Sequence, residues 1–235
     1  FQDLHLALTV DGQARHLSLR VRPPGNRAAA LQGRVIIDTD GDFQPREAHF
    51  FLHGDGLPLR PYAPLARGLA GTLDLRLRGH WAGTLDELQG QLTVHEPIPP
   101  DANPPRRFLE QLATLRGLFE WHRQPTGWRG QLELIGLDVG GKPHWDTTLN
   151  LHRARPDGAL QGKIQHLPVK LLAALASPWL DPDLMQRIAR LEPSGSLSAT
   201  RFSLSPDLTG IEIHSRFEDL SIRGSDDIPA LDGLD

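Results

Sequence analysis

The stretch "GTLDLRLRGHWAGTLDELQGQLTV", residues 71–94, has the pattern of two β-strands joined by a short turn. Leu73, Leu75 and Leu77 alternate with charged residues, and a second apolar row leads to Val94 after a break rich in glycine. Successive side chains of a strand point to opposite faces, so this alternation predicts strands with one apolar face and one polar face.

The same pattern recurs along the chain. "LHLALTV" and "ARHLSLRV" flank Asp11-Gly12, a dipeptide typical of two-residue hairpin turns. A turn at these two residues pairs Leu6 with Leu17 and Leu4 with Leu19, and it places the leucines of both strands on one face. About ten such strands follow one another, mostly pairing neighbour to neighbour, so the fold is predicted to be mostly β.

Two stretches instead have helical spacing of their apolar residues. Residues 104–121 are predicted to be one helix, and residues 168–191 to be two helices broken at Ser177-Pro178. The strand–helix–strand order is loosely repeated. We therefore expect either one excised β-rich segment, 1–235, or two loose repeats within it: a first β module, 1–103, and a helix-containing β module, 104–235.

Composition excludes several classes of protein. Of 235 residues 39% are hydrophobic, 23 are glycine and 20 are proline, which fits many short strands and turns. The net charge of −4 argues against a nucleic-acid partner, and the absence of cysteine excludes disulfides and thiolate chemistry. No stretch approaches the roughly 20 apolar residues of a membrane span. The chain starts in the middle of one pattern, at "FQDLHLALTV", and stops in the middle of another, at "IPALDGLD", so we expect it to be an excised piece of a longer protein.

No motif predicts an active site, a metal site or a cofactor. Asp38, Asp40 and Asp42 have the spacing of a calcium loop, but Phe43 and His49 stand where an EF-hand needs glycine and glutamate. This segment is therefore predicted to be a hairpin turn.

His49 and His53 are the other candidate ligands. On a strand they lie roughly 13 Å apart along one face, too far for one ion. We expect no catalytic residue, no metal and no enzymatic activity.

Several short motifs together resemble a known family. Residues 166–222 contain a helical pair ending in Leu-x-Pro-x-Gly-x-Leu, Leu191 to Leu197, and a later strand ending in Phe-x-Asp-Leu, Phe217 to Leu220. The closing "IPALDGLD" and the opening stretch with Trp81 add two further motifs, although Ala230 stands where a glycine is expected. In this order the motifs resemble the periplasmic part of YhdP-type proteins of the AsmA-like superfamily.

The resemblance implies a fold and a function. AsmA-like proteins are long β-structures anchored in the inner membrane of Gram-negative envelopes, and they are implicated in moving phospholipid toward the outer membrane. We therefore expect an elongated, strongly curved antiparallel sheet, groove-like, with a few short helices. The expected partner is phospholipid, with a membrane contacted through regions outside this chain, and the expected location is the periplasm. Protein partners stay unknown. The alternative is a filled β-sandwich that acts as a spacer or protein-docking module.

The expected lining of the groove follows from the alternation. Asp74, Arg76, Gln91 and Glu133 should face water, and their apolar neighbours should face inward. The predicted lining residues are Leu4, Leu6, Leu8, Leu17, Leu19, Leu73, Leu75, Leu77, Leu92, Val94, Leu132, Leu134, Leu149, Leu151, Ile211 and Ile213.

Overall fold

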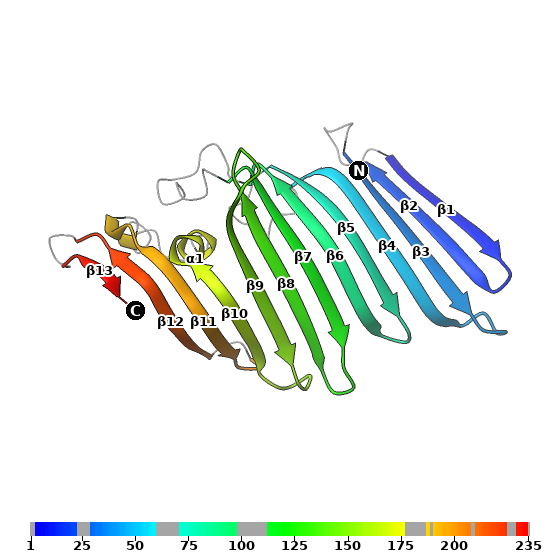
Figure 1. Ribbon diagram of the computed structural model, residues 1–235. Helices are drawn as coiled ribbons and strands as arrows, with labels where there is room; N and C mark the ends of the chain where they lie inside the picture. The colour runs from blue at the N-terminus through cyan, green and yellow to red at the C-terminus, as the bar shows by residue number, and fades with distance from the viewer. Residues whose placement is uncertain are drawn as a thin grey trace.

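The computed structural model is one open antiparallel sheet of 13 strands, in which every strand pairs with its neighbours in the sequence (Figure 1). It describes residues 3–22, 29–59, 71–97, 112–176, 187–188, 190–207, 210–224 and 229–234. The strands are β1 (Asp3–Asp11), β2 (Ala14–Arg22), β3 (Ala30–Thr39), β4 (Pro45–Pro58), β5 (Thr72–Trp81), β6 (Leu85–His95), β7 (Thr114–Arg123), β8 (Trp128–Leu137), β9 (Pro143–Arg153), β10 (Leu160–Pro168), β11 (Ser194–Leu204), β12 (Ile211–Ile222) and β13 (Leu231–Leu234). The predicted β-rich, antiparallel fold is confirmed.

The sheet has two margins formed by the ends of its strands, where the chain passes from one strand to the next, and these two margins differ. At one, which we call the short-turn edge, tight turns join β1 to β2, β3 to β4, β5 to β6 and each later pair. At the other, the long-connection edge, the linking segments include residues 59–71 and 96–113 and the only helix among the described elements, α1 (Val169–Ala176).

The first hairpin has the predicted faces but not the predicted register. Leu8 pairs with Leu17 and Leu6 with Leu19, so the turn lies at Gly12-Gln13, one residue later than expected. Gly12 has a φ of 56°, the positive value that the first position of a type II′ turn requires. Moving the turn by one residue changes each pairing by two, and an even change leaves every side chain on its face.

The helix predicted over residues 104–121 is wrong for the part that the structure describes. Residues 114–121 lie in β7, while 104–111 fall outside the described residues. The apolar residues of this stretch, such as Leu115, Phe119 and Trp121, fit a two-residue period as well as a helical one. The stretch forms a strand because it pairs with β6 on one side and with β8 on the other. The short β13, in the closing segment, was also missed.

The helical pair predicted over 168–191 is confirmed where it is described. The first helix is α1, and residues 187–188 and 190–191 have helical backbone. The predicted break at Ser177-Pro178 lies outside the described residues. The predicted division at residue 103 stays a prediction; β6 and β7, on its two sides, pair directly with each other.

The sheet is a single layer over most of its extent. Its 13 strands span about 58 Å at about 4.8 Å per interval. The accessible surface is 15180 Å², whereas a compact monomer of 26.0 kDa exposes roughly 10,500 Å². The structure therefore leaves much of its apolar surface without a covering layer.

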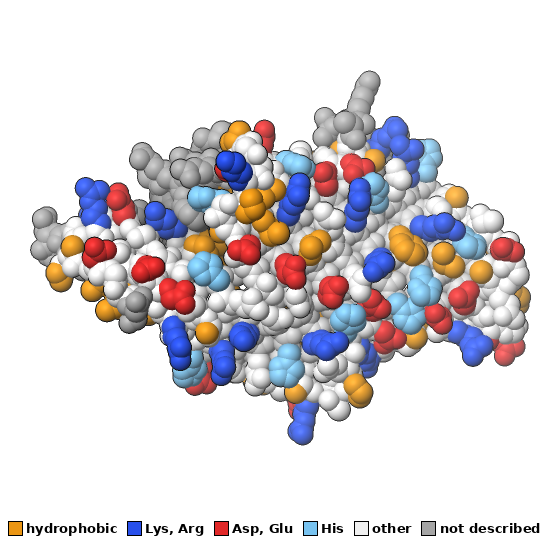
Figure 2. Space-filling view, in the orientation of Figure 1, with side chains coloured by type: hydrophobic (Ala, Val, Ile, Leu, Met, Phe, Trp, Pro, Cys, Tyr) orange, Lys and Arg blue, Asp and Glu red, His pale blue; other side chains and the backbone are white. Residues whose placement is uncertain are grey.

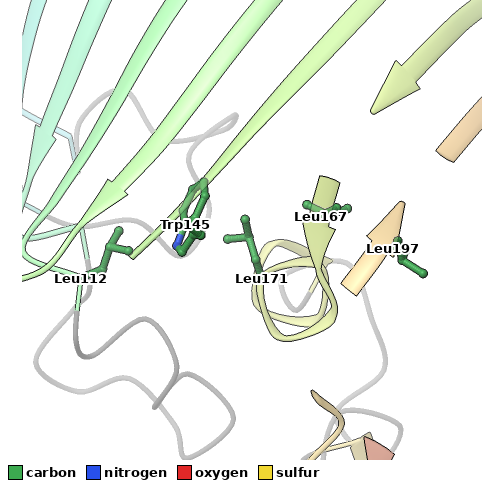
Figure 3. Packing of buried hydrophobic residues seen from close by; sticks show 5 residues of the cluster. All are labelled: Leu112, Trp145, Leu167, Leu171 and Leu197. Carbon is green, nitrogen blue, oxygen red and sulfur yellow. The ribbon is translucent and has the colours of Figure 1, made fainter. Parts of the chain in front are cut away.

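A small core forms where α1 packs on the sheet (Figure 3). Leu171 of α1 is 1% exposed, and it clusters with Leu112, Trp145, Leu167 and Leu197. These residues come from the long-connection edge, so the best-packed part of the molecule is one margin of the sheet.

Glycines within the strands accommodate large side chains of the neighbouring strand. Phe50 lies over Gly79 and Phe119 over Gly90, and each ring occupies the space of a glycine Cβ. Phe202 lies over Gly162 in the same way. The aromatic rings therefore lie low against the backbone instead of standing away from the sheet.

We predict that Gly79→Ala destabilises the chain by about 1–2 kcal/mol, because the new methyl group overlaps the Phe50 ring and forces it out of its place. Urea unfolding followed by circular dichroism measures the change. Gly41→Ala is the control, because nothing lies within 4 Å of a Cβ there, and its effect should stay within about 0.5 kcal/mol. Equal stability of Gly79→Ala and wild type would show that the ring is not held over the glycine.

Candidate functional site

The candidate site is one entire face of the sheet. Across the strands the pairing joins Leu52, Leu77, Gly90, Phe119 and Leu132 in one row. Each step of this row is a direct cross-strand pair, so the five residues share one face. We call this face, which also carries Leu73 and Leu75, the apolar face.

The cross-strand register also settles where the predicted lining residues lie. Leu4, Leu6 and Leu8 of β1 pair with Val21, Leu19 and Leu17 of β2, and the same face continues across the sheet to Ile213 of β12. Exposed members of the predicted set are Leu4, Leu6, Leu8, Leu17 and Ile213; partly buried members are Leu19, Leu73, Leu75, Leu77, Leu92, Leu132, Leu134, Leu149 and Leu151; Val94 is buried. Ile211 pairs with Leu204 through its backbone, and its side chain is not described.

Cover over the apolar face is confined to one margin. Val94, Trp145 and Leu197 lie near the long-connection edge and are less than 10% exposed. Leu8 is 66% exposed and Ile213 57% exposed, toward the short-turn edge. Among the described residues the apolar face is thus covered along part of the long-connection edge, where the core cluster lies, but not at Leu4 of β1, which is 59% exposed at that same edge.

The opposite face is polar and hollowed. It carries the cross-strand partners Arg76 and Gln91, and further charged and histidine side chains are spread over the strands (Figure 2). We call it the charged face. Two hollows on it measure about 1180 Å³ over β1–β7 and about 760 Å³ over β7–β12. Arg76 and Gln91 are exposed, whereas Asp74 and Glu133 are partly buried on the same face.

Asp74 links two strands on the charged face. Its Oδ1 accepts a hydrogen bond of 2.8 Å from the backbone N–H of Gly56, which lies in a bulge of β4, and its Oδ2 lies 2.9 Å from His95 Nε2. The Gly56 N–H, and after it His95, lowers the pKa of the Asp74 carboxyl group. The ionised carboxylate therefore holds the bulge of β4 against β5.

Histidines on the charged face repeatedly lie beside carboxylates. His49 and His80 both contact Glu47, and His214 contacts Glu212. Sequence reasoning compared His49 with His53 along one strand and missed His80, because that contact depends on how β4 pairs with β5 across the connection 59–71.

Comparison with protein-family models gives one match. The model described as YhdP protein matches residues 2–235. The chain belongs to the YhdP family. The predicted family is confirmed, and placement in the AsmA-like superfamily is consistent with it. No curated protein matches the chain, and no solved structure matches it.

Family and fold together fit a segment of an envelope protein. Within the described residues no helix is long and apolar enough to cross a membrane.

We predict that Asp74→Asn lowers stability by about 1 kcal/mol at neutral pH, because the charged hydrogen bond to Gly56 and the contact with His95 are weakened. Since the folded-state pKa of Asp74 is lowered, its contribution is present above the ordinary aspartate pKa of about 3.9 and is lost as the pH falls through the lowered value. Urea unfolding between about pH 3 and pH 7 measures both effects.

Asp146→Asn is the matched control, because Asp146 is an exposed aspartate in the same cross-strand row as Asp74. It should leave stability and its pH dependence nearly unchanged. A similar loss in both variants would contradict a specific role for Asp74.

Proposed function

We propose that the apolar face binds the acyl chains of phospholipid, and that this chain is a periplasmic segment of an inner-membrane-anchored protein that carries phospholipid toward the outer membrane. Membrane contact is then made by regions outside this chain, and the role is one of binding without catalysis. The observation that carries the proposal is a continuous apolar face that has no second layer over most of the described strands.

The exposed leucines give a driving force. Leu4, Leu6 and Leu8 of β1 are each about three-fifths exposed, and large apolar side chains in a row are rarely left in water without a function. Each methylene group of a lipid tail that leaves water contributes about 0.8 kcal/mol. An acyl chain lying along these residues therefore supplies the missing layer.

The dimensions of the face suit a path. One leaflet of a bilayer is about 15 Å of hydrocarbon, so the roughly 58 Å width of the sheet equals several acyl-chain lengths. The rings of Phe50 and Phe119, folded down over glycines, keep the middle of the face low. A continuous surface favours occupancy at successive positions over one fixed site.

The filled sandwich is the less favoured alternative. It requires a second sheet packed on the first, and the described strands all belong to one sheet. A protein docked on the apolar face would cover it just as lipid does. The two roles are therefore distinguished by measuring lipid binding.

We predict that Leu75→Asp weakens lipid binding about tenfold or more while the chain stays folded. Leu75 is partly exposed and pairs with Leu92 and Gly54, so a carboxylate there keeps some water but disrupts the apolar row. A fluorescent NBD-labelled phosphatidylethanolamine, titrated into the purified chain, measures binding, and thermal unfolding measures stability.

Gln91→Asp is the matched control, because it adds the same charge one residue from Leu92 on the opposite face, beside Arg76. It should bind the probe like wild type. Equal binding by Leu75→Asp and wild type would count against the proposal, as would failure of the wild-type chain to bind the probe. Destabilisation of Leu75→Asp by several kcal/mol would instead indicate a filled core.

A further inference from the structure

Three potential metal ligands meet on the charged face. Glu47 and His49 lie two residues apart on β4, and His80 of β5 is the direct cross-strand partner of His49. Glu47 Oε1 lies 3.0 Å from His49 Nε2 and 3.2 Å from His80 Nε2, and the two imidazole rings have centroids 4.8 Å apart. All three groups can offer a ligand atom within 4.8 Å of the others.

The His80 ring lies between two carboxylates, with Nε2 3.2 Å from Glu47 and Nδ1 on the side of Asp86. Its Nε2 is inaccessible to solvent, and although Glu47 lies nearby, this atom completes no hydrogen bond. Its other nitrogen, Nδ1, lies 3.9 Å from Asp86 Oδ2. In protein metal sites a carboxylate behind a histidine commonly orients the ring and makes the coordinating nitrogen more basic.

The surrounding charges leave the three groups available. Arg78, on the same face of β5, donates to Gln89 of β6 through its Nε at 2.9 Å, so this donor is engaged by a group other than Glu47. The three side chains also line one hollow of the charged face, of about 550 Å³.

From this geometry we propose that Glu47, His49 and His80 bind a divalent transition-metal ion of the zinc class. Imidazole nitrogens suit zinc, copper, nickel and iron, and two histidines with one carboxylate leave coordination positions free for water or an anionic group. Around a tetrahedral zinc ion ligand atoms lie about 3.3 Å apart, close to the separations of the Glu47 oxygen from the two histidine nitrogens. Asp86 acts as a positioning residue for His80.

The site differs from the other histidine–carboxylate pairs of the chain. His214 and Glu212 have the same two-residue spacing and a 2.9 Å contact, but no third ligand joins them among the described groups. The bound ion would connect β4 to β5, whose chain connection runs through residues 59–71. Because it lies on the charged face, the site is independent of lipid binding on the apolar face.

The test is isothermal titration of ZnCl₂ into the metal-free 235-residue chain in a chelator-free buffer at neutral pH. We expect one saturable site in the wild type and loss of that site in His80→Gln. Asp86→Asn should weaken binding about 10–100-fold, the usual cost of removing a group that orients a ligand. His214→Gln is the matched control and should bind zinc like wild type.

A thermal shift gives a second measurement. Zinc should raise the melting temperature of the wild type and of His214→Gln but not of His80→Gln. The reason is that a ligand that binds only the folded state stabilises that state. Circular dichroism of each metal-free variant checks its fold. Absence of a saturable site in the wild type would overturn the proposal, and so would unchanged binding by a folded His80→Gln or an equal loss in His214→Gln.

Discussion

The constraint on which the structure depends is the register of neighbouring strands. Because side chains alternate with a period of two, each strand can place its apolar residues on the common face only if its pairing is offset by an even number of residues. The row through Leu77 and Phe119 keeps this parity over nine successive pairings, from Leu6 of β1 to Ile164 of β10. A bulge between Gly54 and Leu57 adds one residue to β4, and this extra residue places Leu57 opposite Leu73 on the apolar face.

Much of the fold could be predicted from local sequence, for a physical reason. Leu73, Leu75 and Leu77 alternate strictly with polar residues, so their strand and their common face follow from the period alone. The face of Leu6 and Leu17 was also correct even though the turn was misplaced, because the error in pairing was even. The family could be identified from the order of weak motifs, although each motif alone is unspecific.

The missed features depend on contacts distant in the sequence. Residues 114–121 carry apolar positions that satisfy both periods, and only the flanking strands β6 and β8 select the strand. The meeting of His49 and His80 needs the register of β4 against β5, which no local turn fixes because residues 59–71 separate them. The spacing of histidines along a single strand predicts no metal site, because the candidate ligands come from two neighbouring strands.

The chain-order pairing of the strands makes this a nearly one-dimensional molecule. Among the described residues each strand has its extensive contacts with the preceding and following strands, and α1 adds contacts with β10 and β11 and a cluster of Leu171 with Trp145 of β9. In such an array each strand is stabilised by its two neighbours. A weak pairing between two adjacent strands therefore lets the parts on either side of it unfold independently of each other. Under a force applied perpendicular to its strands, this sheet should unfold one hairpin at a time. Because the paired strands are close in the sequence, it should also refold quickly.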